Sequence, residues 1–175
     1  MNQNFIPEAI NNFNVYHGDA KRLIGISGEV KLPDFEALTE TLQGSGIAGE
    51  VDDPITGHFK DMTMEIPFSN LFDSIDPLLN TTNALLITLR GSLQVTDKST
   101  NATDYIGVKV VLRGKCTKYQ PGKVDAGKKT EAQINLAIAY IRIDIDGKTQ
   151  VELDKLNLTY KLNGVDLLEK VKSQI

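Results

Sequence analysis

The chain has 175 residues, one cysteine and a net charge of −4, from 19 lysine and arginine residues against 23 aspartate and glutamate residues. A chain of this length fits one domain, residues 1–175, that buries roughly 70% of its unfolded surface. The acidic balance disfavours a general nucleic-acid-binding protein, because attraction to phosphates needs clustered excess cationic charge. A single cysteine, Cys116, excludes an intramolecular disulfide, and we interpret it as a small core residue.

The first residues do not have the composition of a secretory leader. Residues 1–14 have neither a basic start nor a continuous apolar stretch. No run approaches the ~20 apolar residues of a membrane helix. We therefore expect a protein without a membrane segment, made and folded in a reducing cytoplasm.

The N-terminal third contains three segments of different character. Residues 1–19 are rich in asparagine with isolated apolar anchors, and we expect an N-terminal arm that docks on its own body or on a neighbour. Residues 22–32 alternate between apolar and polar and predict a strand that ends at Pro33. Residues 41–58 are Gly-rich and acidic, and long connections of this kind are usually either disordered or functional.

The next segment predicts a strand followed by a short helix. Alternation over residues 59–68 predicts the strand. Ser69 is a plausible N-cap for a helix in which apolar residues, Leu71, Phe72, Ile75 and Leu79, recur at helical spacing. Pro77 should kink or end this helix.

Residues 84–96 and 105–119 have the two longest runs of period-two hydrophobicity in the chain. They predict a hairpin joined through the turn-forming residues 97–104. Each strand would have one buried face and one wet face, as in a half-solvated antiparallel sheet. The wet face would carry Thr88, Arg90, Ser92, Gln94, Lys109, Arg113 and Lys115.

The last third predicts three more strands and a helix. Residues 133–145 contain apolar residues in two phases, which a bulge near Ala139-Tyr140 would reconcile. Asp146-Gly147 is a strong type I′ hairpin signal that returns the chain into a strand over 149–153. Residues 155–162 alternate as a last strand, and residues 164–175 then form a C-terminal amphipathic helix. Its apolar stripe is Leu168, Val171 and Ile175.

No local pattern indicates catalysis, a cofactor or a metal. The string Gly122 to Thr130 is one residue from a phosphate-binding loop, but Lys129 stands where the magnesium-binding Ser or Thr is required and a strand follows instead of a helix. His17 and His58 are too isolated to build a zinc site with one cysteine. Glu50, Asp52 and Asp53 could hold a metal, but an acidic run in a Gly-rich loop is far more often simply hydrated. We therefore expect a protein that is not an enzyme.

These patterns predict a mainly antiparallel β-barrel or sandwich with one or two short helices. Periodicity does not decide whether its wet, cationic face lines a ligand cavity, a channel or an oligomer surface. A monomeric β-barrel that binds a small ligand therefore stays open as an alternative.

Several stretches resemble the major tail tube protein of contractile-tailed bacteriophages, and together they cover essentially the whole chain. The most specific are the loop Gly44-Ser-Gly-Ile-Ala-Gly-Glu50, the pairs Arg90-Gly91 and Arg113-Gly114, and the ending Asn163-Gly-Val-Asp166. The segments Ile10 to Tyr16, Leu32 to Glu50, Gly57-His58-Phe59 and Tyr160 to Asp166 also share the pattern.

The resemblance implies a structural protein whose hexameric rings stack into the hollow inner tube of a phage tail or an R-type bacteriocin. The resemblance does not decide between these two particles. Its implied partners are copies of itself, a contractile tail sheath protein, a tape-measure protein, and baseplate and tail terminator proteins. The particle would assemble in the bacterial cytoplasm.

The resemblance also suggests roles for individual residues. Contacts between subunits would come from Gly44, Gly46, Ile47, Gly49, Glu50, Leu168, Val171 and Ile175. The lumen or a subunit seam would be lined by Arg90, Gln94, Lys109, Arg113 and Lys115. We expect nearby carboxylates to offset these cations, because a conduit for nucleic acid must not retain its cargo. We also favour docking of the C-terminal helix on a neighbour, because Gly164 allows it to swing away.

Overall fold

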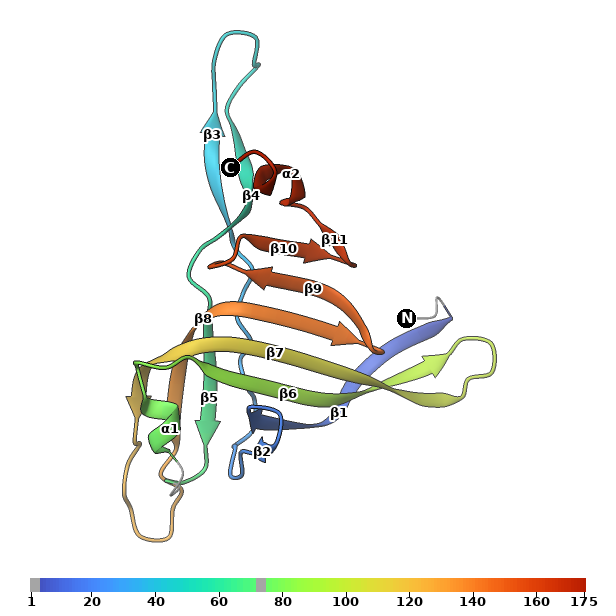
Figure 1. Ribbon diagram of the computed structural model, residues 1–175. Helices are drawn as coiled ribbons and strands as arrows, with labels where there is room; N and C mark the ends of the chain where they lie inside the picture. The colour runs from blue at the N-terminus through green and yellow to red at the C-terminus, as the bar shows by residue number, and fades with distance from the viewer. Residues whose placement is uncertain (1–3, 72–74) are drawn as a thin grey trace.

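The structure, a computed structural model, describes residues 4–71 and 75–175 and consists of a large bent antiparallel sheet from which a two-stranded sheet projects (Figure 1). The strands of the large sheet are β1 (Phe5–His17), β2 (Lys21–Arg22), β5 (Thr63–Phe68), β6 (Leu85–Asp97), β7 (Thr103–Gln120), β8 (Ala132–Ile145), β9 (Lys148–Asp154), β10 (Thr159–Leu162) and β11 (Val165–Asp166). The projecting sheet pairs β3 (Ala37–Leu42) with β4 (Val51–Phe59), and the helices are α1 (Asp76–Leu79) and α2 (Glu169–Lys172). The prediction of a mainly antiparallel β fold with short helices is confirmed.

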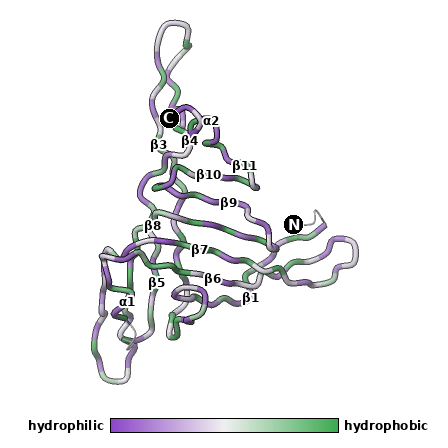
Figure 2. Tube along the Cα trace, in the orientation of Figure 1, coloured by the Kyte–Doolittle hydropathy of each residue, from purple (hydrophilic) through white to green (hydrophobic). Residues whose placement is uncertain are grey.

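The strand order of the large sheet is β11-β10-β9-β8-β7-β6-β1-β2, and β5 pairs with β8 outside this path. Its centre is the predicted hairpin of β6 and β7, which keeps an unbroken register from Leu85 opposite Gly114 to Thr96 opposite Thr103. Figure 2 shows hydrophobic and hydrophilic residues alternating along these central strands. Alternation gives the sheet one apolar face and one polar face, as the sequence predicts.

The predicted bulge in β8 is confirmed at Ala139. Tyr140 pairs with Arg113 and Ile138 pairs with Gly114, so Ala139 has no partner in the β7 ladder. The carbonyl of Ala139 instead accepts a hydrogen bond from the Lys155 N–H at 3.0 Å. The first half of β8 pairs with β5, whereas the second half pairs with β9. The bulge therefore lets one strand belong to two differently directed parts of the sheet.

The core fills the space between β5 and the rest of the sheet. Alternate residues of the β5 segment are buried, as predicted, and they meet buried residues of β1, β6, β7, β8 and β9. The largest fully buried side chains include Met64, Ile66, Phe68, Ile87, Leu112, Ile134, Leu136, Ile141 and Leu153. Cys116 is buried among them, which confirms its interpretation as a core residue.

Residues 23–32 do not form the predicted strand. The chain pairs through single bridges at Ile26 with Phe68 and at Lys31 with Glu65. Gly25 and Gly28 have φ angles of +87° and +71°, which interrupt an extended strand. The regular alternation of buried and exposed side chains is therefore lost. Ile24, which the predicted strand would place on its apolar face, is 79% exposed.

The helix expected after Ser69 begins later than predicted. It starts at Asp76, with Pro77 in its first turn, where a missing N–H and a fixed φ are tolerated. Proline therefore starts this helix and does not end it. Ser69 lies in a bend after β5, where its carbonyl accepts the Thr130 N–H at 3.1 Å, and Phe72 lies outside the described residues.

The last predicted strand is shorter than expected because its first half is a turn. Leu156 is 76% exposed and Leu158 has a φ of +49°, so only Thr159–Leu162 pairs with β9. The carboxylate of Asp154 accepts the backbone N–H groups of Leu156 and Asn157 and so holds this turn. The type I′ signal at Asp146-Gly147 is confirmed, since both residues have positive φ.

Gly114 has a steric role that follows from the bulge. A Cβ at this position would overlap the carbonyl oxygen of Ala137 and approach Ile138 Cδ1 to 2.8 Å. At Gly91, by contrast, the nearest atom to such a Cβ is the Asn12 oxygen at 3.5 Å, an ordinary contact. The close approach of β7 and β8 at the bulge therefore depends on glycine at 114.

We expect Gly114→Ala to lower the free energy of unfolding by about 1–3 kcal/mol through overpacking. Urea denaturation of the monomer measures this change. Gly91→Ala is the matched control and should change stability by less than about 0.5 kcal/mol. Equal stabilities of the two variants would contradict the steric role of the bulge.

Candidate assembly surfaces

The β3–β4 hairpin projects from the body as a two-stranded sheet (Figure 1). The sequence predicted a long loop over residues 41–58, but Leu42 pairs with Val51 and only residues 43–50 connect the strands. These connecting residues include every assembly candidate of this region, namely Gly44, Gly46, Ile47, Gly49 and Glu50. The structure therefore brings the candidates together at the tip of a protrusion.

The base of the hairpin is fixed to the body by packing. The Phe59 ring makes edge-to-face contacts with Phe35 and Tyr160, at centroid distances of 6.0 and 5.1 Å. Leu168 packs so closely on Gly57 that a Cβ there would lie 2.6 Å from Leu168 Cδ1. These contacts give physical reasons for glycine and phenylalanine in the Gly57-His58-Phe59 motif.

The C-terminal segment docks partly on its own chain. The helix covers Glu169–Lys172 and is shorter than the predicted 164–175, because Val165–Asp166 first pairs with β10. Leu168 is buried in its own subunit, although we expected the whole apolar stripe to dock on a neighbour. Val171 and Ile175 are 44% and 84% exposed. These two residues stay candidates for a contact with another subunit.

The expected N-terminal arm is strand β1, which docks on its own body. It pairs antiparallel with β6 from Phe5 opposite Asp97 to His17 opposite Ile87. On its other edge β2 pairs with Tyr16 and His17, and within the described residues no strand pairs with that edge between Phe5 and Asn14. An exposed strand edge offers unpaired N–H and C=O groups to another chain.

The polar face of the sheet carries the predicted lumen or seam residues, and carboxylates lie beside them. Arg90 and Lys109 lie 3.2 and 3.5 Å from the Asp19 carboxylate. Arg113 is 2.7 Å from Asp154. The expectation that carboxylates offset these cations is confirmed for these three residues. Lys115 is exposed at the end of the same face.

Two further residues of this face have defined environments. Gln94 donates to the Glu8 carboxylate at 2.6 Å. Thr88, expected on the wet face, is fully buried because the turn after β1 brings Asp19 over it, and its hydroxyl lies 3.5 Å from Asp19 Oδ1. The Lys109 ammonium, followed by Arg90, holds the pKa of Asp19 below its ordinary value.

Ion pairs continue across the remaining strands of this face. They join Arg142 with Asp144 at 2.9 Å, Lys161 with Glu152 at 3.1 Å and Lys172 with Asp166 at 2.7 Å. Ion pairs thus extend across this face from β6 to α2. A face of this kind has many charges but little excess of either sign.

The sequence located the cations of this face and predicted that carboxylates would offset them, but it did not identify which carboxylates. Asp19 is 71 positions from Arg90, and Asp154 is 41 positions from Arg113. No local pattern joins residues so far apart. Only the pairing of β1, β6, β7 and β8, together with the turn after β1, brings them together.

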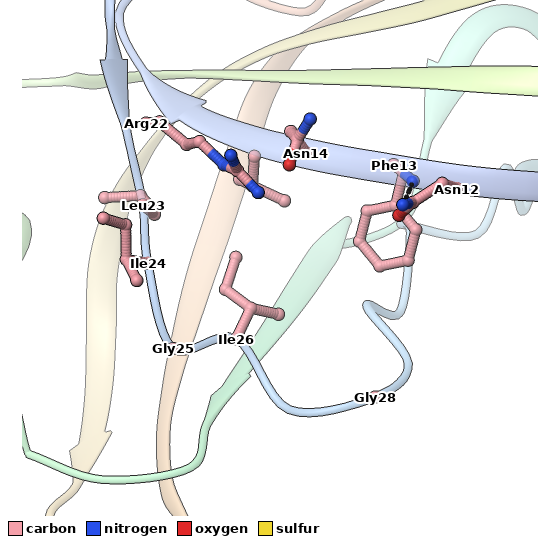
Figure 3. A pocket seen from close by; sticks show the side chains of 10 residues that line it. Asn12, Phe13, Asn14, Arg22, Leu23, Ile24, Gly25, Ile26 and Gly28 are labelled. Atoms are coloured by element: carbon pink, nitrogen blue, oxygen red, sulfur yellow. Dashed lines mark hydrogen bonds between the residues drawn. The ribbon is translucent and has the colours of Figure 1, made fainter.

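Two surface hollows test the alternative of a small-ligand binding protein. One, of about 270 Å³, lies beside the β1 edge, where Phe13 and Ile26 point into it and Arg22 is its charged residue (Figure 3). The other, of about 290 Å³, is lined mostly by apolar residues, including Ile10, Val30 and Leu89. Both are at the lower end of the usual 300–1,000 Å³ of ligand pockets. Their size gives no support to a ligand-binding module.

Among the described residues, no group of three or more His, Cys, Asp or Glu side chains is arranged to hold a metal. None of the helices in the described ranges is long and apolar enough to cross a membrane. Burial raises the pKa of the Cys116 thiol and so disfavours its reactive thiolate form.

An open strand edge and a projecting hairpin are surfaces on which another chain can pair or dock. A family model described as "Phage tail tube protein FII" matches residues 7–175. The chain is 30% identical over 154 residues to the tail tube protein of Escherichia phage P2, which covers 86% of this chain and 87% of that protein. It is 26% identical over 169 residues to the major tail tube protein of Serratia phage KSP20, covering 93% and 91%.

The fold also matches a solved structure. The sheath/tube terminator of an extracellular contractile injection system, in its extended state, superposes with a TM-score of 0.55 at 15% identity, over 79% of this chain and 97% of that chain. The chain belongs to the phage tail tube protein FII family. Members of this family are structural tail tube proteins and not enzymes, as the sequence predicts for this chain.

Asp154 is the most strongly bound carboxylate of the polar face. Burial by itself would raise its pKa. The Asn157 amide, the N–H groups of Asn157 and Leu156, and Arg113 together outweigh burial, so the pKa lies below the ordinary 3.8. The pKa of Asp154 is lower in the folded than in the unfolded chain. Asp154 therefore stabilises the fold fully at pH values above the unfolded pKa, and this stabilisation is lost as pH falls through the folded pKa.

We expect Asp154→Asn to lower the free energy of unfolding at pH 7 by about 1–3 kcal/mol. It should also weaken the pH dependence of stability below about pH 4. Urea unfolding at pH 7 and at about pH 3 measures both effects. Asp125→Asn is the control, because it removes an exposed ion pair with Lys128 and should cost less than about 0.5 kcal/mol. An unchanged pH dependence in Asp154→Asn would contradict the role of this carboxylate.

Proposed function

We propose that the chain forms six-membered rings that stack into the hollow inner tube of a contractile phage tail or a phage-tail-like bacteriocin. In this role it would be the conduit through which genome or other cargo passes the host envelope. The observation that carries the proposal is membership of the tail tube family over residues 7–175. The unpaired edge of β1 and the projecting hairpin supply surfaces for the contacts that such an assembly needs.

The ends of the sheet support the proposal of a ring. One end is the β1 edge, on which β2 covers only Tyr16 and His17, and the other is the two-residue strand β11, so the two ends differ. Two different surfaces that bind each other repeat head to tail, and they close into a ring when the rotation permits. Edge-to-edge pairing of successive sheets would remove the exposed edge that a monomer leaves.

The polar face is the proposed lumen wall. Arg90, Lys109 and Arg113 lie on it with carboxylates within 2.7 to 3.5 Å. A wall of free cations would neutralise phosphates of passing DNA, and the retention would accumulate along the tube. Paired charges keep the wall hydrated without retaining a polyanion.

The proposal includes partners on the outside, inside and ends of the tube. Phage tail tube proteins are parts of the virion tail, and the tail tube proteins of phages P2 and KSP20 are the relatives of this chain. A sheath protein would surround the tube, a tape-measure protein would fill it before firing, and baseplate and terminator proteins would close its ends. We propose that assembly takes place in the bacterial cytoplasm.

The first experiment shortens the hairpin. Replacing residues 43–50 by Asn-Gly gives a two-residue type I′ connection between the paired residues Leu42 and Val51. We expect a folded monomer, because the base contacts of Phe59 and Gly57 are kept, but no tubes. Circular dichroism checks the fold, and negative-stain microscopy with sedimentation checks assembly. Normal tubes from this variant would remove the tip from the assembly contacts.

The same region should respond to assembly in the unchanged protein. We expect amides of residues 43–50 to exchange quickly in the free subunit and slowly in tubes, because contact with a neighbour excludes water. Amides of the β6–β7 hairpin, protected in both states, are the internal reference. Equal exchange of the tip in both states would contradict its role.

The second experiment tests the lumen wall. Wild-type tubes should not retain duplex DNA at physiological salt. Tubes of Asp19→Asn, which leaves Arg90 and Lys109 without this carboxylate, should retain DNA with a salt slope of about −0.9 per phosphate neutralised. Filter binding at several salt concentrations measures the slope.

Glu8→Gln is the matched control for the lumen experiment. It makes the same charge change, but Glu8 binds the neutral side chains of Gln94 and Thr96, so no cation is freed. Tight DNA retention by wild-type tubes, or equal behaviour of Asp19→Asn and Glu8→Gln, would contradict the assignment of this face.

A further inference from the structure

The two ends of the molecule carry opposite charge. Residues 37–59, the β3–β4 hairpin, contain Glu40, Glu50, Asp52 and Asp53 and no lysine or arginine. The nearest lysine in sequence, Lys60, is paired with Glu36 at 2.6 Å. The negative charge of the hairpin therefore has no lysine or arginine within the hairpin to balance it.

The pairing of β3 with β4 concentrates this charge. Glu40 lies directly opposite Asp53 in the ladder, and both are exposed. Like charges at directly opposite positions destabilise a strand pair. On the same face, the neighbouring pair Leu42 and Val51 is 46% and 54% exposed. This face thus presents an apolar pair beside an acidic pair, and a surface with cations and an apolar residue would complement both.

The end of β7 and the β7–β8 connection, residues 115–131, together called the β7–β8 loop, have the complementary composition. They contain five exposed lysines, two at the end of β7 and three in the connection, against two acidic residues, and Asp76 of the neighbouring α1 adds a third. One of the acids, Asp125, is paired with Lys128 at 2.6 Å. Val124 is 90% exposed, and the Lys123 N–H donates to the Thr130 carbonyl at 2.8 Å, which closes the loop.

The acidic hairpin and the basic loop lie at opposite ends of the molecule (Figure 1). They cannot meet within one copy, so any contact between them joins two copies head to tail. We propose that the β3–β4 hairpin of one copy docks on the β7–β8 loop of the next, with Glu40 and Asp53 facing lysines of that loop. This inference rests on the proposed assembly and names the surface that receives the hairpin.

The contact has consequences for assembly. Relief of the Glu40–Asp53 repulsion would occur only when a neighbour supplies the cations, so the charge pattern favours the assembled state over the free subunit. The contact also sets the direction in which copies stack, because docking of one hairpin on another would bring acidic residues together. Assembly should slow as salt rises, since exposed charges are screened.

Charge exchange between the two ends tests the proposal. The first variant carries Glu40→Lys, Glu50→Lys and Asp53→Lys. It reverses the charge of the hairpin and keeps the Asp52 contact with Thr41. The second variant carries Lys118→Glu, Lys123→Glu and Lys129→Glu. It reverses the charge of the loop and keeps the Lys128–Asp125 ion pair. Each alone should reduce sedimentable polymer by about tenfold or more, because like charges then meet. Their mixture, or both sets in one chain, should restore polymer.

Controls separate this proposal from the proposed function. Circular dichroism checks that each variant folds, and the restored mixture shows it independently. Lys98→Glu, Lys148→Glu and Lys170→Glu change the same number of charges at exposed positions outside the hairpin and the β7–β8 loop, and should leave polymer yield within about twofold. If wild-type protein assembles but the reversed variants assemble equally well, or the mixture fails to recover, the docking proposal is wrong and the tube function stands. If wild-type protein forms no ring or tube, the proposed function itself is wrong.

Discussion

The shape of the molecule depends on one local constraint, the close approach of β7 and β8 at Gly114 and the bulge at Ala139. Without the extra residue, β8 would continue along one sheet and its two apolar phases would bury opposite faces. With it, Ile134 and Leu136 face the core beside β5, and Ile141 faces the same core beside β9. One kinked strand therefore encloses a core that a flat sheet of the same strands would leave open.

The enclosed core leaves the other face of the sheet free for charge. On that face Asp19, Asp144, Glu152, Asp154 and Asp166 form ion pairs with cations of the sheet and of α2. Exposed pairs of this kind add little to stability. Their effect is on the surface potential, which pairing keeps near neutral even where arginine and lysine are numerous. This property suits a wall along which a polyanion is proposed to pass.

The hairpin combines a fixed base with an exposed tip. Phe59 packs between Phe35 and Tyr160, and Leu168 covers Gly57, so the direction of the protrusion is set by the core and the C-terminal segment together. Beyond the base, none of the ion pairs among the described residues involves Glu40 or Asp53, and Leu42 and Val51 stay about half exposed. A rigid base with charged and apolar groups exposed beyond it suits a docking element. Its fixed direction lowers the conformational entropy that is lost on binding.

The sequence by itself determined the features that depend on neighbouring residues. Period-two alternation located β6 to β9, the change of apolar phase located the bulge at Ala139, and Asp146-Gly147 located a tight turn, since each is a local preference of the backbone. Tertiary structure alone decided where distant segments meet. It paired β1 with β6, converted most of the 41–58 segment into strands, buried Leu168 on Gly57, and placed Asp19 and Asp154 beside cations tens of residues away. These outcomes come from long-range packing and pairing, which local patterns do not encode.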